Sequence, residues 1–498
     1  MDKLYSSIIE SKTGFEIPVF SNNKPMHSKY DPIREAQTII QSVSKSDFYI
    51  ILGLGSGFIP KLLKENQPDC NIIIIENSDS DIDFLLSNIK GLKEYINENK
   101  IILTTINQID STLKHYFLPV FYNNLSVIEI RSWMTELNEK SSNIKKQINY
   151  TLDEILRDYA TQAHFGKIWQ KNIIDNLKLF SPVKLDFNTE KIAYIIAAGP
   201  SLDDKIQEIK DNIKDICIIS TDTAYSTLKK YNINPDVICS LDGQLLSLEH
   251  FKNNLAPLPL FVFDLQANSS ASRKIKNENG NIIFTKSNHP LVSYCDYHNS
   301  FNFLYSGSGT VTIMAVDLAL KAGFKTIKII GADFSYPHNK PYAKGTYLDS
   351  LYNNNSLRIS TSQTKYSGLM FKTELFVNNY RCKTTKLLES YKNSFESWLY
   401  TQNLAFSYQD FIYTINNTNP LNKLKETCFS YEKFLEKLKK DCSRFNSDIK
   451  RNNSDFSELE IALLPYIAFL KAQLQKTQKN IQYNELVKLA LQNIVRYT

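Results

Sequence analysis

The sequence predicts an α/β protein built from short parallel strands that alternate with helices, followed by a helical C-terminal region. Three observations predict this class. Near-continuous apolar runs recur along the chain, as expected for parallel strands that are covered on both faces. Several of these runs end in glycine or small polar residues and lead directly into segments of helical periodicity. The last part of the chain, from about Pro420, carries apolar residues at helical spacing and lacks strand-like runs.

The composition predicts several domains with substantial cores and no nucleic-acid partner. The chain has 498 residues, of which 42% are hydrophobic, and its net charge of +6 is spread along the sequence. Dense Lys/Arg clusters interleaved with aromatic residues, which mark nucleic-acid interfaces, do not occur. The seven cysteines are scattered without a CxxC pair, which favours a reducing compartment over a disulfide framework or a zinc site. Because neither a signal peptide nor a membrane-spanning run is apparent, we expect a cytoplasmic protein.

We expect four segments along the chain. An N-terminal Rossmann-like α/β domain covers 1–135, a helical linker covers 136–185, the central α/β domain covers 186–415 and a helical domain covers 416–498. In the linker, an apolar stripe at helical spacing indicates one long helix, which Ser181-Pro182 ends.

The N-terminal domain carries a glycine-rich turn. The strand-like run from Phe48 ends in Gly53-x-Gly55-x-Gly57, a helix-like stretch follows, and a second strand ends in the acid Glu76. This layout is typical of the nucleotide-binding start of a Rossmann-like domain, including class I methyltransferases, in which the acid binds ribose. Because no methyltransferase catalytic motif follows, a structural or vestigial domain is the favoured interpretation.

An acidic patch, Asp79-x-Asp81-x-Asp83, follows this second strand. Alternate carboxylates suit a hard cation, but the patch lacks the glycine and the terminal glutamate of a calcium loop. We therefore favour a solvated loop that caps a helix starting near Phe84, where the helix dipole stabilises negative charge.

The central domain opens on the stretch Ile192–Leu202, IAYIIAAGPSL. This stretch predicts a buried strand, a tight turn at Gly199-Pro200-Ser201 and a helix that follows at once. Ser201 is expected to be the N-cap of this helix, with Asp204 as its capping partner. Free backbone N–H groups at the helix start would bind the phosphate of a nucleotide, and Gly199 would let it approach the backbone. An ordinary strand-to-helix turn is the alternative.

Further strand-like runs follow in the central domain, and several of their ends carry small, hydroxyl or carboxylate side chains. Ligands of such sheets bind beyond the carboxyl ends of the strands, at a point where the strand order reverses. We therefore expect these side chains to converge on one site. They are Asp222 and Thr223; Ser240, Asp242 and Gly243; Ser306, Gly307, Ser308 and Gly309; and Asp333 with Tyr336.

The segment 345–400 is rich in Ser, Thr, Asn and Tyr and shows little periodicity. A long insertion of this kind is often a lid or an acceptor-binding segment, and a surface loop is the alternative. Beyond it, helices are expected over 421–438, 459–475 and 485–495. This helical end would bind a partner or a second copy of the chain, as in a homo-oligomer.

The central domain resembles the motility-associated factor (Maf-type) flagellin glycosyltransferases. Three stretches carry the resemblance: AAGPSLDD (197–204), STDTAYSTLKKYNINPDVICSLDG (220–243) and SGSGTVTIMAVDLALKAGFKTIKIIGADFSY (306–336). The W-x-x-N-x-x-x-N pattern of Trp169, Asn172 and Asn176 is similar too. The resemblance is good over roughly 165–345 and looser in the N-terminal domain.

The resemblance implies a transferase that uses a CMP-activated nonulosonic acid of the pseudaminic, legionaminic or sialic kind. The acceptors would be Ser/Thr hydroxyls of flagellin, and the activity would serve flagellar assembly and motility. The central domain would be similar to that of bacterial sialyltransferases, a Rossmann-like variant of the GT-A fold. The positions that match sialyltransferase motifs are Gly199, Pro200 and Ser201; Ser306 and Gly307; Asp333; and Tyr336 with Tyr342.

This chain departs from the sialyltransferase pattern at two points. Ala197 stands where that pattern has glycine, and no histidine follows Tyr342, so the catalytic histidine of those enzymes has no counterpart here. His338, between the two tyrosines, is our first candidate for the general base, and His289 is the second.

The residues implied for the site fall into two sets, for all of which ordinary loop or packing roles are the alternative. Tyr336 and Tyr342 would donate hydrogen bonds to the departing CMP, which requires neither a metal nor another cofactor. Asp222 and Asp242 would accept hydrogen bonds from cytosine or ribose. The catalytic set is Tyr336, Tyr342, His338 and Asp333. The nucleotide-binding set is Gly199, Pro200, Ser201, Asp222, Thr223, Ser240, Asp242, Ser306, Gly307 and Ser308.

Two other functions stay open from the sequence. An enzyme like the archaeal pterin pyrophosphokinases shares a GPSL-like loop and would need ATP and magnesium. A non-catalytic flagellin-binding or assembly factor would use the helical termini and the first domain, and its central site would be idle.

Overall fold

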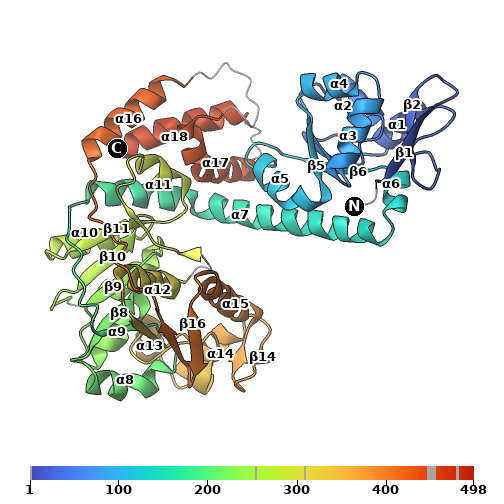
Figure 1. The fold of residues 1–498 in the computed structure, drawn as a ribbon. Coiled ribbons are helices and arrows are strands. Elements are labelled where there is room, and N and C mark those ends of the chain that lie inside the picture. Colours follow the sequence, from blue (N-terminus) through green and yellow to red (C-terminus); the bar gives the residue numbers. More distant parts are fainter. Residues whose placement is uncertain (1–2, 253–254, 308–309, 446–455, 478–481) are drawn as a thin grey trace. The chain divides into compact units, whose positions relative to one another are not determined.

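The computed structural model describes residues 3–252, 255–307, 310–445, 456–477 and 482–498 (Figure 1). These residues form two compact units. Unit 1 consists of the described residues of Met1–His164 and Ile467–Leu486, and unit 2 of those of Phe165–Lys450, Phe456–Tyr466 and Val487–Thr498. The expected four-domain division stays a prediction. In the two-unit division, the long helix α7 (Glu139–Lys178) contributes to both units, and the C-terminal helices do not form a unit of their own.

Unit 1 is built around a parallel sheet of four strands in the order β5-β4-β3-β6. All five residues of β3 are buried, which explains why this strand reads as an uninterrupted apolar run. A separate antiparallel pair, β1 and β2, precedes the sheet. The elements are β1 (Tyr5–Glu10), β2 (Glu16–Phe20), α1 (Pro32–Gln41), β3 (Phe48–Leu52), α2 (Phe58–Asn66), β4 (Asn71–Glu76), α3 (Asp79–Asn88), α4 (Leu92–Glu98), β5 (Ile102–Thr105), α5 (Ile109–Tyr116), β6 (Leu125–Glu129) and α6 (Arg131–Glu136).

The glycine-rich turn after β3 is packed against side chains of its own unit. A Cβ atom on Gly55 would lie 2.0 Å from Nε2 of His27, and one on Gly53 would lie 2.8 Å from Cγ of Trp133. Both glycines have positive φ angles, +53° and +94°, which L side chains rarely adopt. The glycines are therefore required by the turn and by its close packing within the unit.

Glu76, the acid at the end of β4, is completely buried. Its carboxylate accepts hydrogen bonds from the backbone N–H of Leu54 at 2.9 Å, from Trp133 Nε1 at 2.5 Å and from the Tyr5 hydroxyl at 3.2 Å. Burial raises the pKa of Glu76 to about 7, and the bonds from Leu54, Asn77 and Trp133 oppose this rise. Because donors of the chain surround this carboxylate, no face of it is exposed to a ribose.

The acidic patch after β4 is part of a helix. Helix α3 begins at Asp79, earlier than expected, and Ser78 is its N-cap. Asp79 and Asp83 are exposed, but Asp81 is buried, and its carboxylate accepts the backbone N–H of Leu4 at 2.8 Å. The expectation of a solvated loop is therefore wrong for Asp81, which tethers the first strand instead.

Unit 2 contains a sheet of nine strands in the order β12-β11-β10-β9-β8-β7-β13-β17-β16. The strands from β7 to β13 are parallel, as the sequence predicted, and β16 and β17 add an antiparallel pair at one edge. The strands are β7 (Ile192–Ile196), β8 (Ile216–Thr221), β9 (Val237–Ser240), β10 (Leu260–Asp264), β11 (Ile282–Lys286), β12 (Asn302–Phe303), β13 (Thr326–Ile330), β16 (Ala405–Gln409) and β17 (Ile412–Asn416).

The strand order of unit 2 reverses between β7 and β13. From β7 to β12 the chain adds strands in one direction, and it then returns to pair β13 with the other side of β7. Alternate residues of β7 face two cores: Ala193 and Ile195 pack with helix α12, whereas Tyr194 and Ile196 pack with α8 and α9. Because the helices that connect these strands cover opposite faces of the sheet, a crevice forms at the carboxyl ends of β7 and β13.

The expected helix over Thr310–Ala322 is present as α12. The insertion 345–400 is largely helical and also contains a short antiparallel pair, β14 (Phe376–Val377) with β15 (Lys383–Thr384). Helix α16 begins at Tyr431, because the Ser430 side chain caps it, and not near Leu421 as expected. The helices are α8 (Leu202–Asp211), α9 (Asp222–Lys230), α10 (Ser269–Asn277), α11 (Pro290–Cys295), α12 (Val311–Ala322), α13 (Tyr347–Asn354), α14 (Ser362–Met370), α15 (Lys386–Thr401) and α16 (Tyr431–Ser443), with α17 (Glu458–Lys476) and α18 (Tyr483–Tyr497) shared by the units. Among the described residues, no helix is both long and apolar enough to cross a membrane.

Candidate functional site

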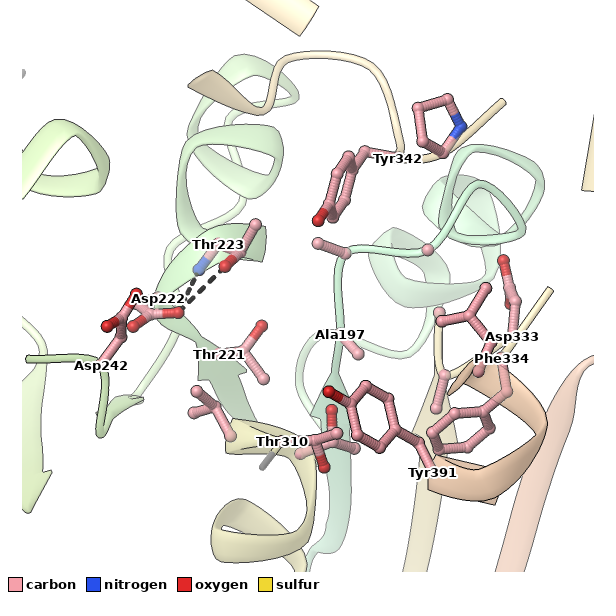
Figure 2. Close-up of a pocket in the computed structure, with 18 of the residues that line it drawn as sticks. Ala197, Thr221, Asp222, Thr223, Asp242, Thr310, Asp333, Phe334, Tyr342 and Tyr391 are labelled. Carbon is pink, nitrogen blue, oxygen red and sulfur yellow. Dashed lines mark hydrogen bonds between the residues drawn. The ribbon is translucent and has the colours of Figure 1, made fainter. Parts of the chain in front are cut away.

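A cavity of about 680 Å³ lies beyond the carboxyl ends of β9, β8, β7 and β13, at the reversal of strand order (Figure 2). Because neighbouring strands lie about 4.8 Å apart, these four ends span roughly 14 Å. The wall also includes residues of α7, of the start of α12 and of the insertion helices α14 and α15. The cavity therefore extends across the ends of several strands of the sheet.

Eight of the residues expected at the site line this cavity: Gly199, Asp222, Thr223, Asp242, Gly243, Asp333, Tyr336 and Tyr342. Others do not line it: Pro200, Ser201, Ser240, Ser306, Gly307 and His338. Ser308 and Gly309 lie outside the described residues. The first group follows β7, β8, β9 and β13, so the expected convergence holds for these ends, whereas the end of β12, which carries Ser306 and Gly307, lies at the edge of the sheet and does not reach the cavity.

The Gly199-Pro200-Ser201 turn is held against the end of β13. The Gly199 N–H donates to the carbonyl of Gly331 at 2.8 Å, and a Cβ atom on Gly199 would lie 2.4 Å from that oxygen. The Ser201 N–H donates to Asp333 Oδ2 at 2.9 Å, and the Ser201 hydroxyl donates to Asp333 Oδ1. Ser201 is therefore not the expected side-chain N-cap of α8, and its N–H is not free for a phosphate.

Asp333 joins the ends of β7 and β13 through these two bonds. Burial raises its pKa to about 6, and the two hydrogen bonds from Ser201 oppose this rise. Its contacts favour a role in holding the turn, since both carboxylate oxygens already accept a hydrogen bond.

Asp222 and Asp242 lie together at the other end of the cavity (Figure 2). Asp222 is fixed by the Thr223 N–H at 2.6 Å and hydroxyl at 3.1 Å, and by the Ser240 hydroxyl at 2.6 Å. Ser240 thus does not line the cavity itself but orients the Asp222 carboxylate that does. Asp242 accepts the Gln244 N–H at 2.9 Å, and its pKa is raised by burial, with a further contribution from Asp222.

Two buried asparagines of α7 hold the loops that follow β9 and β10. The Asn172 amide donates to the carbonyls of Gly243 at 2.9 Å and Gln266 at 3.1 Å. The Asn176 amide donates to those of Leu265 and Ala267, each at 2.9 Å. The W-x-x-N-x-x-x-N pattern therefore connects a helix to two strand ends, and its Trp169 lines the cavity.

Tyrosines occupy the wall near β13. Tyr336 and Tyr342 are half-buried, and burial raises the pKa of both, so they are neutral hydrogen-bond donors at neutral pH. In the described part of the chain, neither phenol oxygen has a hydrogen-bond partner. Tyr391 of α15, which sequence reasoning did not single out, also lines the cavity, and Figure 2 shows its ring on the side opposite Tyr342. In the sequence, only the position of Tyr391 within the 345–400 insertion indicated a possible place at the site.

The histidines lie elsewhere than the sequence suggested. The His338 side chain is 57% exposed, lies 2.8 Å from Asp204 and does not line the cavity. His289 is buried, and its Nδ1 accepts the Leu291 N–H at 3.1 Å, which caps α11. Burial lowers the pKa of His289 to about 3. His250, in the turn Leu245–Phe251, lines the cavity, and no local sequence pattern indicates this.

The cavity wall is acidic. It contains the carboxylates of Asp222, Asp242 and Asp333, and none of the described residues that line it is a lysine or an arginine. Within the described ranges, no cluster of three or more His, Cys, Asp or Glu side chains is arranged to hold a metal ion. An anionic ligand would therefore depend on hydroxyl, imidazole and backbone donors.

One family model and several known proteins are similar to the chain. The family model of 6-hydroxymethylpterin diphosphokinase MptE-like proteins matches residues 167–339. Three uncharacterized proteins of Treponema pallidum (strain Nichols) are similar to the chain. They are 28%, 29% and 26% identical over 53%, 26% and 40% of this chain, and over 80%, 64% and 44% of their own lengths. The chain thus spans less than two thirds of the second and third relatives.

A solved structure is also similar, that of the MAf glycosyltransferase from Magnetospirillum magneticum AMB-1. The identity is 14%, the TM-score is 0.49, and the alignment covers all of this chain and 91% of that one. The MptE-like match at 167–339 contains every cavity-lining residue except Phe165 and those from Pro341 onward. The part of the cavity formed by the insertion therefore lies outside the matched segment.

Proposed function

We propose that this protein is a glycosyltransferase that moves a nonulosonic acid, of pseudaminic, legionaminic or sialic type, from its CMP-activated donor to Ser/Thr hydroxyls of flagellin in the cytoplasm. The observation that carries the proposal is the convergence of four strand ends on one elongated cavity. Paired carboxylates lie at one end, and at the other lie two tyrosines whose phenol oxygens have no hydrogen-bond partner among the described residues. Such a cavity suits a nucleotide that is bound at one end and reacts at the other.

In the proposed reaction, an acceptor hydroxyl attacks the anomeric carbon of the sugar. The bond between that carbon and the phosphate oxygen breaks, and its electron pair leaves with CMP. Tyr336 and Tyr342 donate hydrogen bonds to the negative charge that develops on CMP. Their contribution matters more here because the described wall offers no lysine or arginine.

The acceptor proton passes to a base in this scheme. His338 is the proposed base, since its exposed side chain lies two positions beyond Tyr336, where a hydroxyl of an acceptor protein would arrive from solvent. The insertion helices, which contribute Leu369, Leu388 and Tyr391 to the wall, form the proposed acceptor side of the cavity.

A second function is favoured by the match to the MptE-like family model over 167–339. The protein would then be a pterin pyrophosphokinase-like enzyme that uses ATP and magnesium. Calorimetry with CMP and with ATP–Mg²⁺ distinguishes the two: the glycosyltransferase proposal expects binding of CMP and none of ATP–Mg²⁺.

The deciding experiment is the intact mass of flagellin from cells with and without the gene. The proposal expects a loss of one or more nonulosonic acid masses upon deletion, restored by the wild-type gene and not by a Tyr336→Phe, Tyr342→Phe form. Unchanged flagellin mass would refute the proposal. Restoration by the double variant would refute the proposed role of the two tyrosines in the transfer.

A further inference from the structure

The end of the cavity nearest α7 has an aromatic wall. Phe165 and Trp169 line the cavity and are partly exposed, and their rings stack with centroids 5.4 Å apart and planes 26° apart. Trp169 lies beside the turn after β9, since a Cβ atom on Gly243 would be 3.4 Å from its Cδ1. Flat aromatic surfaces of this kind bind the faces of planar heterocycles.

Two polar side chains stand beside this wall. Asp242 accepts one hydrogen bond on its carboxylate, from Gln244, and among the residues that the structure describes its second oxygen has no partner. His250 is 8% exposed, lines the cavity and packs edge-on against Tyr347 with ring centroids 5.1 Å apart. Its Nδ1 is buried without a partner in the described part of the chain. An unpaired buried nitrogen is costly unless something supplies the missing hydrogen bond.

This end is also held in place before any ligand arrives. Asn172 fixes the Gly243 carbonyl at 2.9 Å, directly after Asp242. The Asn268 N–H donates to the Asp242 carbonyl at 3.0 Å. The carboxylate is therefore presented by a backbone that is anchored on both α7 and the loop after β10, which is the kind of preorganisation that a recognition site requires.

We propose that Phe165, Trp169, Asp242 and His250 form a base-recognition subsite for the donor nucleotide, in which the aromatic wall contacts the face of the base, Asp242 accepts from an exocyclic amino group and His250 bonds the adjacent ring nitrogen. The ligand class is an amino-substituted heterocycle with a donor next to an acceptor, as in cytosine. The identity of that base as cytosine rests on the proposed function. The phosphate then lies over β8 and β7, and the sugar lies near Tyr336.

The test measures binding of CMP, of its analogue without the 4-amino group, of UMP, of ATP–Mg²⁺ and of ribose 5-phosphate to the full chain by calorimetry. For wild type we expect CMP to bind at least about tenfold more tightly than the des-amino analogue and UMP. Trp169→Leu and His250→Ala should each weaken CMP binding by about tenfold or more and leave ribose 5-phosphate binding unchanged. Asp242→Ala, which removes the acceptor, should abolish the preference for CMP over the des-amino analogue.

Controls separate recognition from folding. Tyr400→Leu and His298→Ala alter exposed rings outside the cavity and should bind CMP as wild type does. Trp169→Phe should recover most of the binding that Trp169→Leu loses. Melting temperatures of all variants report folding independently of binding.

The outcomes distinguish the subsite from the proposed function. Equal loss of CMP and ribose 5-phosphate binding in the Trp169 and His250 variants, or a wild-type protein indifferent to the 4-amino group, overturns the subsite. Preference for ATP–Mg²⁺ with the same variant effects supports the subsite with adenine as its base and refutes the glycosyltransferase. Selective CMP binding without transfer from any CMP-nonulosonate supports the subsite and refutes only the proposed reaction.

Discussion

Ser201 and Asp333 explain the role of the Gly199-Pro200-Ser201 turn, for which the sequence allowed either a phosphate site or an ordinary strand-to-helix turn. Their hydrogen bonds tie the turn after β7 to the end of β13. The motif therefore builds the cavity wall. Its glycine, Gly199, lies so close to the neighbouring chain that a Cβ atom there would be 2.4 Å from the Gly331 carbonyl oxygen, which no larger residue could accommodate. Other lining residues, among them the tyrosines and Asp242, are the ones with polar atoms that remain without a partner in the described part of the chain.

The Tyr336→Phe and Tyr342→Phe variants test the proposed leaving-group donors. Each substitution removes one hydroxyl and keeps the ring, so folding should be preserved. We expect each to lower the transfer rate by about 10²–10³-fold, or roughly 3–4 kcal/mol of transition-state stabilisation. The measurement is kcat with a CMP-nonulosonate donor. A double variant at near wild-type rate would remove both tyrosines from the mechanism.

The titration of Glu76 should appear in the pH dependence of stability. Burial raises its pKa to about 7 in the folded chain, from an ordinary value near 4.5. The folded state therefore holds this proton more tightly than the unfolded state, and the stability that results is present below about pH 4.5 and is lost as the pH rises through 7. Glu76→Gln cannot titrate, so its deficit relative to wild type should shrink between pH 5 and pH 8.

Urea unfolding of the wild type and of Glu76→Gln at the two pH values measures this. Comparison of the two proteins at each pH cancels the titration of all other groups. A stability difference that stays constant or grows with pH would contradict the buried, hydrogen-bonded state of this carboxyl.

Helix α7 illustrates how an element far from the strand ends in sequence determines their geometry. Its two asparagines donate four hydrogen bonds to carbonyls of the loops after β9 and β10. In isolation the spacing of these asparagines only indicates that they share a helix face. The structure shows that these asparagines bind the loops after β9 and β10, which the spacing alone does not indicate.

Asn172→Ala should act on donor binding more than on the chemical step. The substitution removes the Asn172 amide from the carbonyls of Gly243 and Gln266, and Gly243 keeps only the longer bond from the Asn268 amide at 3.5 Å, so we expect a cost of about 1–3 kcal/mol. Because this turn carries Asp242, we expect KM for the donor to rise several-fold and kcat to change little. Steady-state kinetics measures the split. Asn149→Ala, at an exposed position of the same helix, is the matched control. A fall in kcat with unchanged KM would contradict a role in shaping the nucleotide end.

Across the whole chain, the two units differ in what their strand ends offer to a ligand. In unit 1, His27 and Trp133 pack against the turn after β3, and Trp133 and Tyr5 donate hydrogen bonds to the acid at the end of β4. In unit 2 the corresponding edge opens into a cavity of about 680 Å³. Both units have a parallel sheet with a glycine-containing turn. In unit 1, side chains from distant parts of the sequence fill the space beyond the strand ends, whereas in unit 2 this space remains open as a cavity.

Hydrogen–deuterium exchange with and without CMP tests this difference. We expect slower exchange upon CMP binding in unit 2, at segments 197–201, 221–223, 241–244 and 331–342, and no change at 53–57. A change at 53–57 would show that unit 1 also binds the nucleotide, contrary to the filled turn. S-adenosylmethionine should leave exchange unchanged throughout.

The sequence by itself determined the secondary structure of both units to a large extent, together with the places where chemistry could occur. Apolar runs and helical periodicity are local properties, so the parallel strands from β7 to β13, the long helix α7 and the polar strand ends could be predicted. The start of α16 could not, because the cap at Ser430 competes with an equally periodic stretch before it.

Only the tertiary structure decided which strand ends meet and which side chains remain open to a ligand. The pairing of β13 with β7 depends on the helices that cross opposite faces of the sheet, and this pairing brings Asp333 to Ser201. The burial of Glu76, the exposure of His338 and the entry of His250 into the cavity depend on residues far away in the chain. Local patterns carry no information about such long-range packing, so these assignments required the fold.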